Sequence, residues 1–382
     1  PTIAELNAVA PDTPTLVVFL YSMGFLNRAG AEALGITAET PAPAGGRFEF
    51  IDGGVVLHAT PNPMILYGTI ARLPGLSPED QINSTLHLYR ELNRFGLTSV
   101  IDPGGGGHAY PADYGATTAI ASAQRVEGAP ALTLRISNYL FAQKPGSELA
   151  DISDWTARER LGIDRAIDVL NGFVLRGAGE NLVWSAGDFE NFLAARPDLA
   201  PSMEADLAAA VRLLAEKQWP IRIHATYDES ISRILDVFER VFAETGYAAR
   251  WAIDHAETVS PENLARIKRL GGGIAVQNRM SFAGESFVGR YGVDAASDAP
   301  PLRAMLDAGI PVGAGTDATR VSSYNPWVSI HWLVTGQTVG GTPLASPENR
   351  LSRDEALTLY TVGSAWFSGE ETLKGRLAPG RF

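Results

Sequence analysis

The sequence contains no cysteine among its 382 residues. Disulfide bonds and thiolate metal ligands are therefore excluded, and a bound metal would need histidine, carboxylate or modified lysine ligands. The chain also lacks any long block of basic residues, and its formal net charge is −12, so we do not expect nucleic acid as a partner. No apolar run reaches the roughly 20 residues of a membrane span, and the residues from Pro1 onward do not lead us to expect a signal peptide.

These absences leave a protein of ordinary composition, with 45% hydrophobic and 19% charged residues. Such a chain can bury a large core, either as one α/β barrel with an attachment or as several smaller domains. We expect a cytoplasmic protein that acts on a small-molecule substrate and contacts neither nucleic acid nor membrane. A homo-oligomer stays open.

Residues 1–65 differ in pattern from the rest of the chain. They contain a Pro/Gly-rich stretch at 41–46 and an Asp52-Gly53 pair between two apolar runs, which indicates a β-hairpin. This part is expected to be a small α+β segment. A helix from Ser77 to about Phe95 follows, because a capping serine, a proline at the first turn and a glycine after the end are typical helix boundaries.

Beyond this helix, short apolar runs alternate with helical segments, which is typical of an α/β fold. The predicted strands are 98–102, 132–138, one within 173–184, 220–224, 250–255, 273–277 and 312–317. The predicted helices include 202–217, 228–244, 260–270, 299–308 and 352–368. A doubly wound sheet, the competing fold, usually carries a glycine-rich phosphate loop, and none is evident. Because a closed (β/α)8 barrel needs one strand more than these seven, we predict an incomplete TIM-like barrel.

His224, His255 and Asp317 each stand at the end of one of these predicted strands. Side chains at the carboxyl ends of barrel strands converge on one face. The chain has six histidines, and two of them hold this position, which favours a divalent-metal site. Taken singly, the histidines could equally be buried hydrogen-bonded residues, and the aspartate a helix cap. Imidazole and carboxylate ligands suit zinc, with manganese, iron or cobalt as alternatives.

Several stretches around these residues resemble the amidohydrolase superfamily, and more narrowly its amidohydrolase-3, YtcJ-like branch. The stretches are IRIHATYDE at 221–229, AIDHAETVSPE at 252–262, PVGAGTDA at 311–318 and KGRLAPGR at 374–381. The opening PTIAELNAVAPD at 1–12 is similar to an insertion that this branch carries after its first strand. The resemblance covers essentially the whole chain, and its motifs are specific as a set.

This resemblance implies a role for each site residue. His224 and His255 would be metal ligands from strands five and six, and Asp317 would be both a metal ligand and the general base. Glu180 is the candidate strand-four ligand, because the matching segment has no lysine where the family commonly has a carboxylated one; a surface glutamate is the alternative. The implied reaction is hydrolysis of an amide or related C–N bond by metal-activated water, with one or two ions.

The sequence departs from the family at its ends. No two histidines stand two residues apart, so the His-x-His pair of the family's first strand is absent, as is most of the small β-sandwich. We therefore expect a chain without strand one. In this interpretation residues 1–65 are an insertion segment packed on the barrel, and residues 66–382 contain strands two to eight.

Three further residues are candidate substrate contacts. His108 follows a run of glycines after the second strand, Arg279 ends the seventh strand, and Trp327 belongs to a plausible apolar wall after Asp317. A surface salt bridge is the alternative for Arg279. Two other functions stay open, namely a mononuclear deaminase of the aminopurine or aminopyrimidine type and a catalytically incomplete barrel that acts as a binding module.

Overall fold

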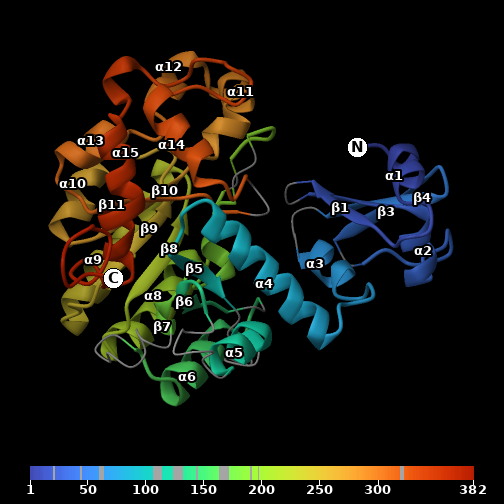
Figure 1. Ribbon diagram of the computed structural model, residues 1–382, viewed down its shortest axis with the longest axis horizontal. Helices are drawn as coiled ribbons and strands as arrows, with labels where there is room; N and C mark the ends of the chain where they lie inside the picture. Colours follow the sequence, from blue (N-terminus) through green and yellow to red (C-terminus); the bar gives the residue numbers. More distant parts are fainter. Residues whose placement is uncertain are drawn as a thin grey trace. The chain divides into compact units, whose positions relative to one another are not determined.

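The computed structural model describes residues 1–19, 22–43, 45–59, 64–105, 114–123, 132–142, 145–162, 172–189, 192–196, 198–318 and 322–382. The chain forms two compact units, Pro1–Gln81 and Ile82–Phe382 (Figure 1). The division falls within helix α4 (Pro78–Arg94). The expectation that residues 1–65 are an insertion packed on the barrel stays a prediction.

Unit 1 contains a four-stranded antiparallel sheet with strand order β1-β2-β4-β3. Its strands are β1 (Leu16–Phe19), β2 (Met23–Leu26), β3 (Gly46–Ile51) and β4 (Gly54–Ala59), and its helices are α1 (Ile3–Val9), α2 (Arg28–Leu34) and α3 (Met64–Ile70). The predicted hairpin is confirmed as β3 and β4. Asp52 and Gly53 have φ angles of 50° and 77°, and positive φ at both central residues is the mark of the tight turn that suits a twisted hairpin.

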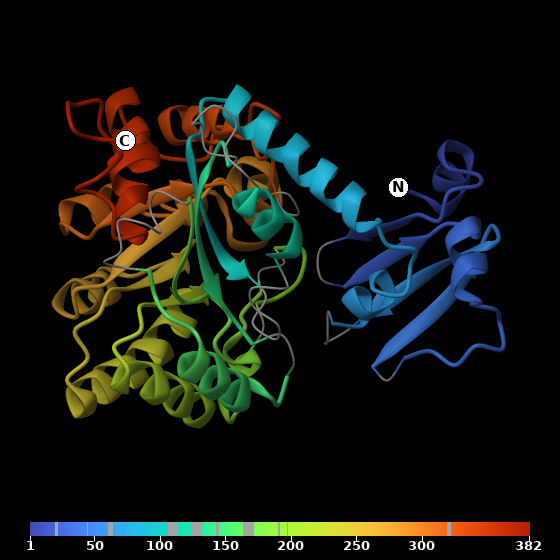
Figure 2. The ribbon, with the colours of Figure 1, turned by 60° about the horizontal axis from the view of Figure 1, so that its bottom comes forward.

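Unit 2 is built on seven parallel strands in the order β11-β10-β9-β8-β7-β6-β5. They are β5 (Ser99–Gly105), β6 (Arg135–Leu140), β7 (Phe173–Ala178), β8 (Ile221–Ala225), β9 (Trp251–His255), β10 (Gly273–Gln277) and β11 (Val312–Gly315). The sheet curls, and helices lie around its outer side (Figure 2). Within the described ranges of unit 2 no further strand joins it. The predicted α/β class and incomplete barrel are therefore confirmed, with one observed strand for each predicted one.

The helices of unit 2 follow the predicted pattern, with two differences. The α-helices after α4 are α5 (Gly115–Ser122), α6 (Glu148–Arg158), α8 (Met203–Glu216), α9 (Asp228–Thr245), α10 (Pro261–Arg269), α11 (Met280–Tyr291), α12 (Val293–Ser297), α13 (Leu302–Asp307), α14 (Pro326–Thr335), α15 (Arg353–Thr358) and α16 (Ser364–Phe367). The short turns η2 (Trp184–Ala186) and η3 (Pro347–Asn349) are 3₁₀ helices. No helix of the described ranges is long and apolar enough to cross a membrane.

Each difference has a physical cause. The helix predicted at 299–308 begins only at Leu302, because the two preceding prolines disfavour a helical conformation in the residue before each of them. The helix predicted at 352–368 is interrupted by a π-helical turn, η4 (Leu359–Gly363). Gly363 packs so closely on the Val312 carbonyl of β11 that a Cβ there would be well under 3.0 Å away.

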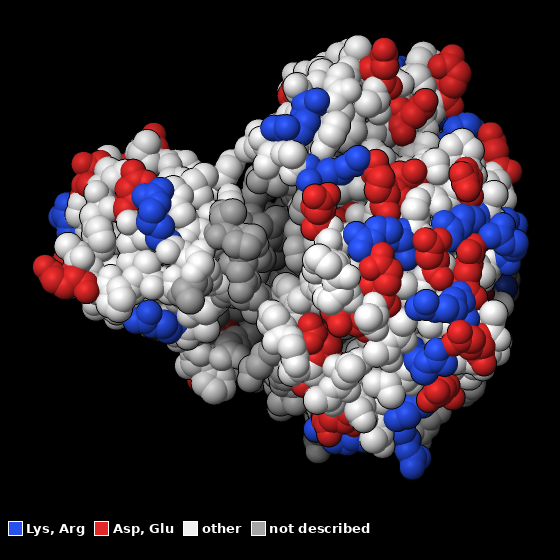
Figure 3. Space-filling model, turned by 180° about the vertical axis from the view of Figure 1, so that it is seen from behind, with Lys and Arg blue, Asp and Glu red and all other residues white. Residues whose placement is uncertain are grey.

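The helices cover the sheet with regularly spaced apolar residues. In α9 the fully buried side chains are Ile231, Ile234, Leu235, Phe238 and Val241. Their spacing of three and four residues places them on one face of a helix. The opposite faces carry charges, and Figure 3 shows both signs interspersed over the larger unit on the face that it draws. The core of unit 2 therefore lies between the curled sheet and this outer helical layer.

Charged and aromatic side chains fill part of the sheet interior. Arg222 of β8 donates to both carboxylate oxygens of Asp254 in β9, with Nε 3.1 and 3.0 Å from them. The guanidinium also lies over the rings of Tyr139 and Phe367, 5.5 and 5.3 Å from their centroids. Arg222 and Asp254 are 7% and 3% exposed. A buried pair with this geometry joins neighbouring strands directly beneath their carboxyl ends.

Two glycines allow the end of β7 to approach neighbouring backbone closely. A Cβ on Gly177 would lie well under 3.0 Å from the Pro220 carbonyl oxygen, and one on Gly179 would meet the Pro103 carbonyl oxygen as closely. The next amide, that of Glu180, donates to the same Pro103 oxygen at 2.9 Å. Gly179 therefore fixes where the chain places Glu180.

Replacing Gly179 with alanine is expected to lower the free energy of unfolding by about 1–3 kcal/mol, because the backbone must move to admit the methyl group. Chemical denaturation of the variant measures this. The control is Gly289→Ala in α11, where a Cβ meets nothing within 4 Å. Alanine there should leave stability unchanged or raise it by about 0.5–1 kcal/mol. Equal stability of the two variants would contradict the close approach at Gly179.

Candidate metal centre

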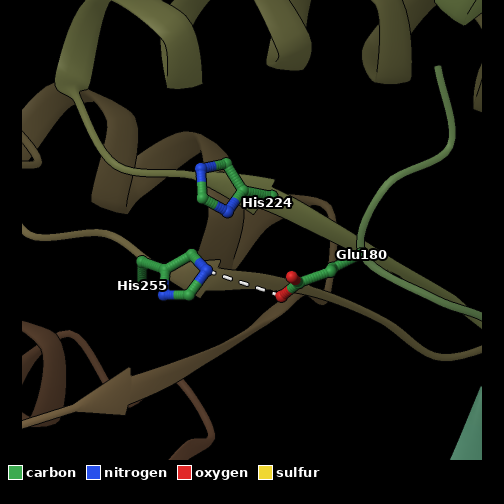
Figure 4. A group of neighbouring side chains, drawn as sticks. All are labelled: Glu180, His224 and His255. Atoms are coloured by element: carbon green, nitrogen blue, oxygen red, sulfur yellow. Dashed lines mark ion pairs between the residues drawn. The ribbon is translucent and has the colours of Figure 1, made fainter. Parts of the chain in front are cut away.

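Three predicted ligands lie together at the carboxyl ends of adjacent strands. Glu180 follows β7, His224 lies in β8 and His255 ends β9. One ligand atom from each lies within 4.8 Å of the others. Figure 4 shows the carboxylate and both imidazoles turned toward a common space, with Nε2 of His255 3.4 Å from Oε2 of Glu180. Each histidine is only 4% exposed, so the group is held within the protein.

The backbone at this edge of the sheet is unusual. His255, Ala256 and Asp317 have φ angles of 83°, 49° and 50°. Non-glycine residues rarely adopt positive φ, and those that do concentrate at functional sites where the surrounding structure holds them. These strained residues end β9 and follow β11. They indicate that the strand ends are shaped to aim side chains rather than to continue the sheet.

The charges of Glu180 and His255 depend on each other. Burial acts to raise the pKa of Glu180, but the imidazoles of His255 and His224 outweigh it and lower that pKa to about 2. Burial acts to lower the pKa of His255, yet the carboxylates of Glu180, Asp317 and Asp254 raise it to about 10. Without an ion, the site therefore balances its negative charge by protonating an imidazole.

Each histidine has its second ring nitrogen bound by another side chain. Nε2 of His224 lies 3.0 Å from Oδ1 of Asp188, and Nδ1 of His255 is hydrogen-bonded to the Gln277 amide. Sequence reasoning did not assign these partners. Asp188 lies in an irregular loop, where no periodicity distinguishes it from any other polar loop residue. Gln277 carried a signal, because it ends β10 at the same edge as the predicted ligands.

Asp317 lies beside this group but is not one of its three members. Its Oδ2 accepts a hydrogen bond from Nη2 of Arg279 at 3.1 Å. The side chain is 31% exposed, yet the loss of surrounding water raises its pKa, while the nearby charge of His255 acts to lower it. Asp317, the predicted general base, is therefore close enough to His255 for the imidazole charge to affect its pKa. The hydrogen bond from Arg279 orients its carboxylate.

Arg279 and Glu257 form the buried wall behind Asp317. The Arg279 side chain is 5% exposed, and its Nε is 4.0 Å from Oε1 of Glu257, which is fully buried. Burial raises the pKa of Glu257 to about 8, so this carboxyl is largely protonated at neutral pH. Arg279 therefore faces both the Glu257 carboxyl and the Asp317 carboxylate.

The other two predicted substrate contacts are Trp327 and His108. Trp327, in the first turn of α14, is 54% exposed. Its indole Nε1 donates to the Phe95 carbonyl at 3.1 Å, which anchors the ring between this helix and the end of α4. His108 lies outside the described residues.

The three clustered side chains fit a divalent cation. Two imidazoles and a carboxylate are ligands that zinc and neighbouring transition metals accept. Nε2 of His255 is buried and, among the described residues, has Glu180 as an ion-pair partner but no hydrogen bond. A cation in the common space would supply the missing partner for this nitrogen and would neutralise the Glu180 carboxylate. Asp317 lies beside this space and interacts electrostatically with all three of its side chains.

Comparison with known proteins agrees with this geometry. A model of the amidohydrolase family matches residues 1–382. The N-substituted formamide deformylase of Arthrobacter pascens is 25% identical over 401 residues, covering 100% of this chain and 69% of that protein. The amidohydrolase YtcJ of Bacillus subtilis is 26% identical over 179 residues, covering 46% of this chain and 33% of that protein.

Among solved structures, a metal-dependent hydrolase from Pyrococcus horikoshii superposes with a TM-score of 0.69 at 20% identity. The superposition covers 100% of this chain and 72% of the other. That likeness supports the fold assignment, and the family match extends over every element that carries a candidate ligand. The predicted resemblance is thus confirmed: the chain belongs to the amidohydrolase family, whose relatives and site chemistry mark it as a metal-dependent hydrolase of C–N bonds.

Proposed function

We propose that Glu180, His224 and His255 hold one zinc ion and that Asp317 acts beside it in hydrolysing a small N-substituted amide. The observation that carries the proposal is the convergence of the three ligand atoms within 4.8 Å at the carboxyl ends of β7, β8 and β9. The carboxyl face of an α/β barrel is where such enzymes place their chemistry. Three donors support one ion, and a second ion would need Asp317 or further donors.

Each ligand contributes a definite property. Glu180 brings the negative charge, and its low pKa keeps it ionised at any pH of interest. His224 and His255 bring neutral nitrogen donors once His255 has lost its proton. A divalent ion held by these three groups would polarise a substrate carbonyl and lower the pKa of a nearby water.

Asp317 is proposed to move the proton. Its carboxylate accepts a proton from the attacking water while the water oxygen bonds to the carbonyl carbon. The same proton is then donated to the amide nitrogen as the C–N bond breaks, so the products are an acid and an amine and Asp317 returns to its starting state. The hydrogen bond from Arg279 orients the carboxylate, and burial raises its pKa toward a value suited to proton transfer.

The substrate side of the site is proposed to include Arg279, Trp327 and His108. Trp327 offers an anchored, exposed aromatic face, which would pack on the apolar part of an amide. The Arg279 guanidinium already serves Asp317, so a substrate carboxylate would share it. The name of the Arthrobacter pascens relative makes N-substituted formamides the first probes.

Metal removal tests the proposal. We expect the full chain to lose hydrolysis of its preferred N-substituted amide after treatment with a chelator and to regain it with zinc. Glu180→Gln, His224→Gln and His255→Gln should each weaken zinc binding by more than about 100-fold, since the loss of a mere outer partner typically costs about 10–100-fold. Isothermal titration with zinc measures the affinity.

The matched control is His331→Gln, which removes an exposed histidine of α14. Its zinc affinity should equal that of the unaltered chain. The proposal fails if the three site variants bind zinc as tightly as this control, or if the stripped protein hydrolyses the amide at the full rate.

A further inference from the structure

The carboxylate of Asp188 is fully buried and, in space, lies against the N-terminal end of α9. It is 0% exposed and lies in the loop after η2. Its Oδ2 accepts hydrogen bonds from the backbone amides of Thr226 and Tyr227, at 2.9 and 3.0 Å. Its Oδ1 lies 3.0 Å from the Thr226 amide and 3.0 Å from Nε2 of His224. Asp188 therefore joins the end of β8, the entry of α9 and a proposed metal ligand.

Both oxygens of Asp188 act as hydrogen-bond acceptors. Burying a carboxylate costs free energy unless donors hydrogen-bond to it, and the Thr226 and Tyr227 amides are such donors here. Tyr227 is the N-cap residue of α9, so the carboxylate also lies at the positive end of an 18-residue helix. The α9 terminus gains a cap from a distant loop, because Tyr227 has no capping side chain of its own.

Both oxygens of Asp188 already accept from backbone amides, so the group that faces His224 is an acceptor. The ring nitrogen that faces it must then carry the proton, so Nε2 of His224 donates to Asp188. In the neutral imidazole, the proton on Nε2 leaves the lone pair on Nδ1. Figure 4 shows one nitrogen of His224 on the side of Glu180 and His255 and the other turned away. The nitrogen turned away is Nε2, which Asp188 holds.

The ring is also fixed against rotation. The Phe189 ring lies 5.1 Å from the His224 ring, centroid to centroid, and the His255 ring lies 4.4 Å from it at an interplanar angle of 63°. Phe189 is the residue next to Asp188 in the chain. One short loop thus supplies both a hydrogen-bond acceptor for Nε2 and an aromatic face for the ring.

We propose that Asp188 is a positioning residue that fixes His224 in the Nε2–H tautomer, so that Nδ1 is the atom offered to the metal. His255 does the opposite, because its Nδ1 is bound by Gln277 and its Nε2 faces Glu180. The two histidines would therefore bind one ion through different nitrogens. This inference rests on the proposed function, since it assigns a role to a residue that supports the same ligands.

Asp188→Asn tests the proposal with little change in shape. The asparagine oxygen can still accept from the Thr226 and Tyr227 amides, but its NH2 group would face Nε2 of His224. A donor in that place favours a proton on Nδ1, the nitrogen that the metal needs. We expect zinc affinity to fall by about 10–100-fold, and long-range ¹H–¹⁵N NMR of the metal-free variant to show the Nδ1–H tautomer.

Asp228→Asn is the matched control. Asp228 also accepts a backbone hydrogen bond at a strand–helix junction, from the Ser260 amide at 2.6 Å, and a side-chain bond from Asn263 at 2.7 Å. It contacts no proposed ligand. We expect this variant to keep its zinc affinity within about two-fold even where its melting temperature falls, because its carboxylate supports only the fold.

The unaltered, metal-free chain provides a measurement that needs no variant. Its His224 signal, assigned by its loss in His224→Gln, should show the Nε2–H tautomer. An Nδ1–H tautomer in that spectrum, or equal zinc affinities of Asp188→Asn and Asp228→Asn, would overturn the role of Asp188. A chain that binds no zinc at all would instead overturn the proposed function, while the tautomer spectrum would still decide what Asp188 does.

Discussion

Replacing Asp317 with asparagine is expected to lower kcat by about 10²–10⁴-fold, the contribution typical of a general base. Asparagine keeps the size of the side chain and can still accept a hydrogen bond from Arg279, so the site should keep its shape. It cannot take a proton from water, and the lost activity should therefore appear in kcat rather than in KM. Steady-state kinetics on the preferred N-substituted amide measure both constants.

The control for this experiment is Asp307→Asn, at the end of α13. This exposed aspartate lies on the outer helical layer, and its kcat should match that of the unaltered chain. Zinc affinity of Asp317→Asn adds a second measurement. If Asp317 is the base alone, affinity stays unchanged; if it is also a ligand, affinity falls together with kcat. Full activity of Asp317→Asn would remove it from the mechanism.

Replacing Arg222 with methionine is expected to lower the free energy of unfolding by about 3–5 kcal/mol. The change leaves the Asp254 carboxylate buried within the curled sheet without its partner. Burial already acts to raise the pKa of Asp254, and Arg222 opposes this. Equilibrium denaturation at neutral pH measures the loss.

Arg212→Met is the control, because the Arg212–Glu244 pair has side chains that are 43% and 45% exposed. An exposed pair of this kind typically contributes only about 0–1 kcal/mol. A double variant, Arg222→Met with Asp254→Leu, should recover part of the loss, because no charge then stays buried alone. If Arg222→Met lowers the free energy of unfolding no more than Arg212→Met does, the Arg222–Asp254 pair is not what joins β8 to β9.

The sequence predicted the seven-stranded sheet because short apolar runs alternate with helical segments along the chain. His224 and His255 were recognisable because each stands at the carboxyl end of a predicted buried strand. That position has a simple geometric meaning in a parallel barrel, where all carboxyl ends face one way. Glu180 required the resemblance to a family, since a glutamate in a loop carries no periodicity of its own.

Other features depended on contacts that no local pattern encodes. Asp188 meets His224 only because two loops pack together, 36 residues apart in sequence. The π-helical turn η4 arises from the close packing of Gly363 on β11, which the helical periodicity of 352–368 conceals. The position of Asp317 beside the three-residue group, rather than within it, follows from its bond to Arg279 and from its positive φ angle.

Anomalous diffraction at the zinc absorption edge, from crystals of the full chain grown with zinc, tests the metal centre most directly. We expect a peak of anomalous density in the common space of Glu180, His224 and His255, with Nδ1 of His224 and Nε2 of His255 facing it. Density for zinc at other places only, with this space left without a peak, would contradict the metal centre and the hydrolysis proposed from it.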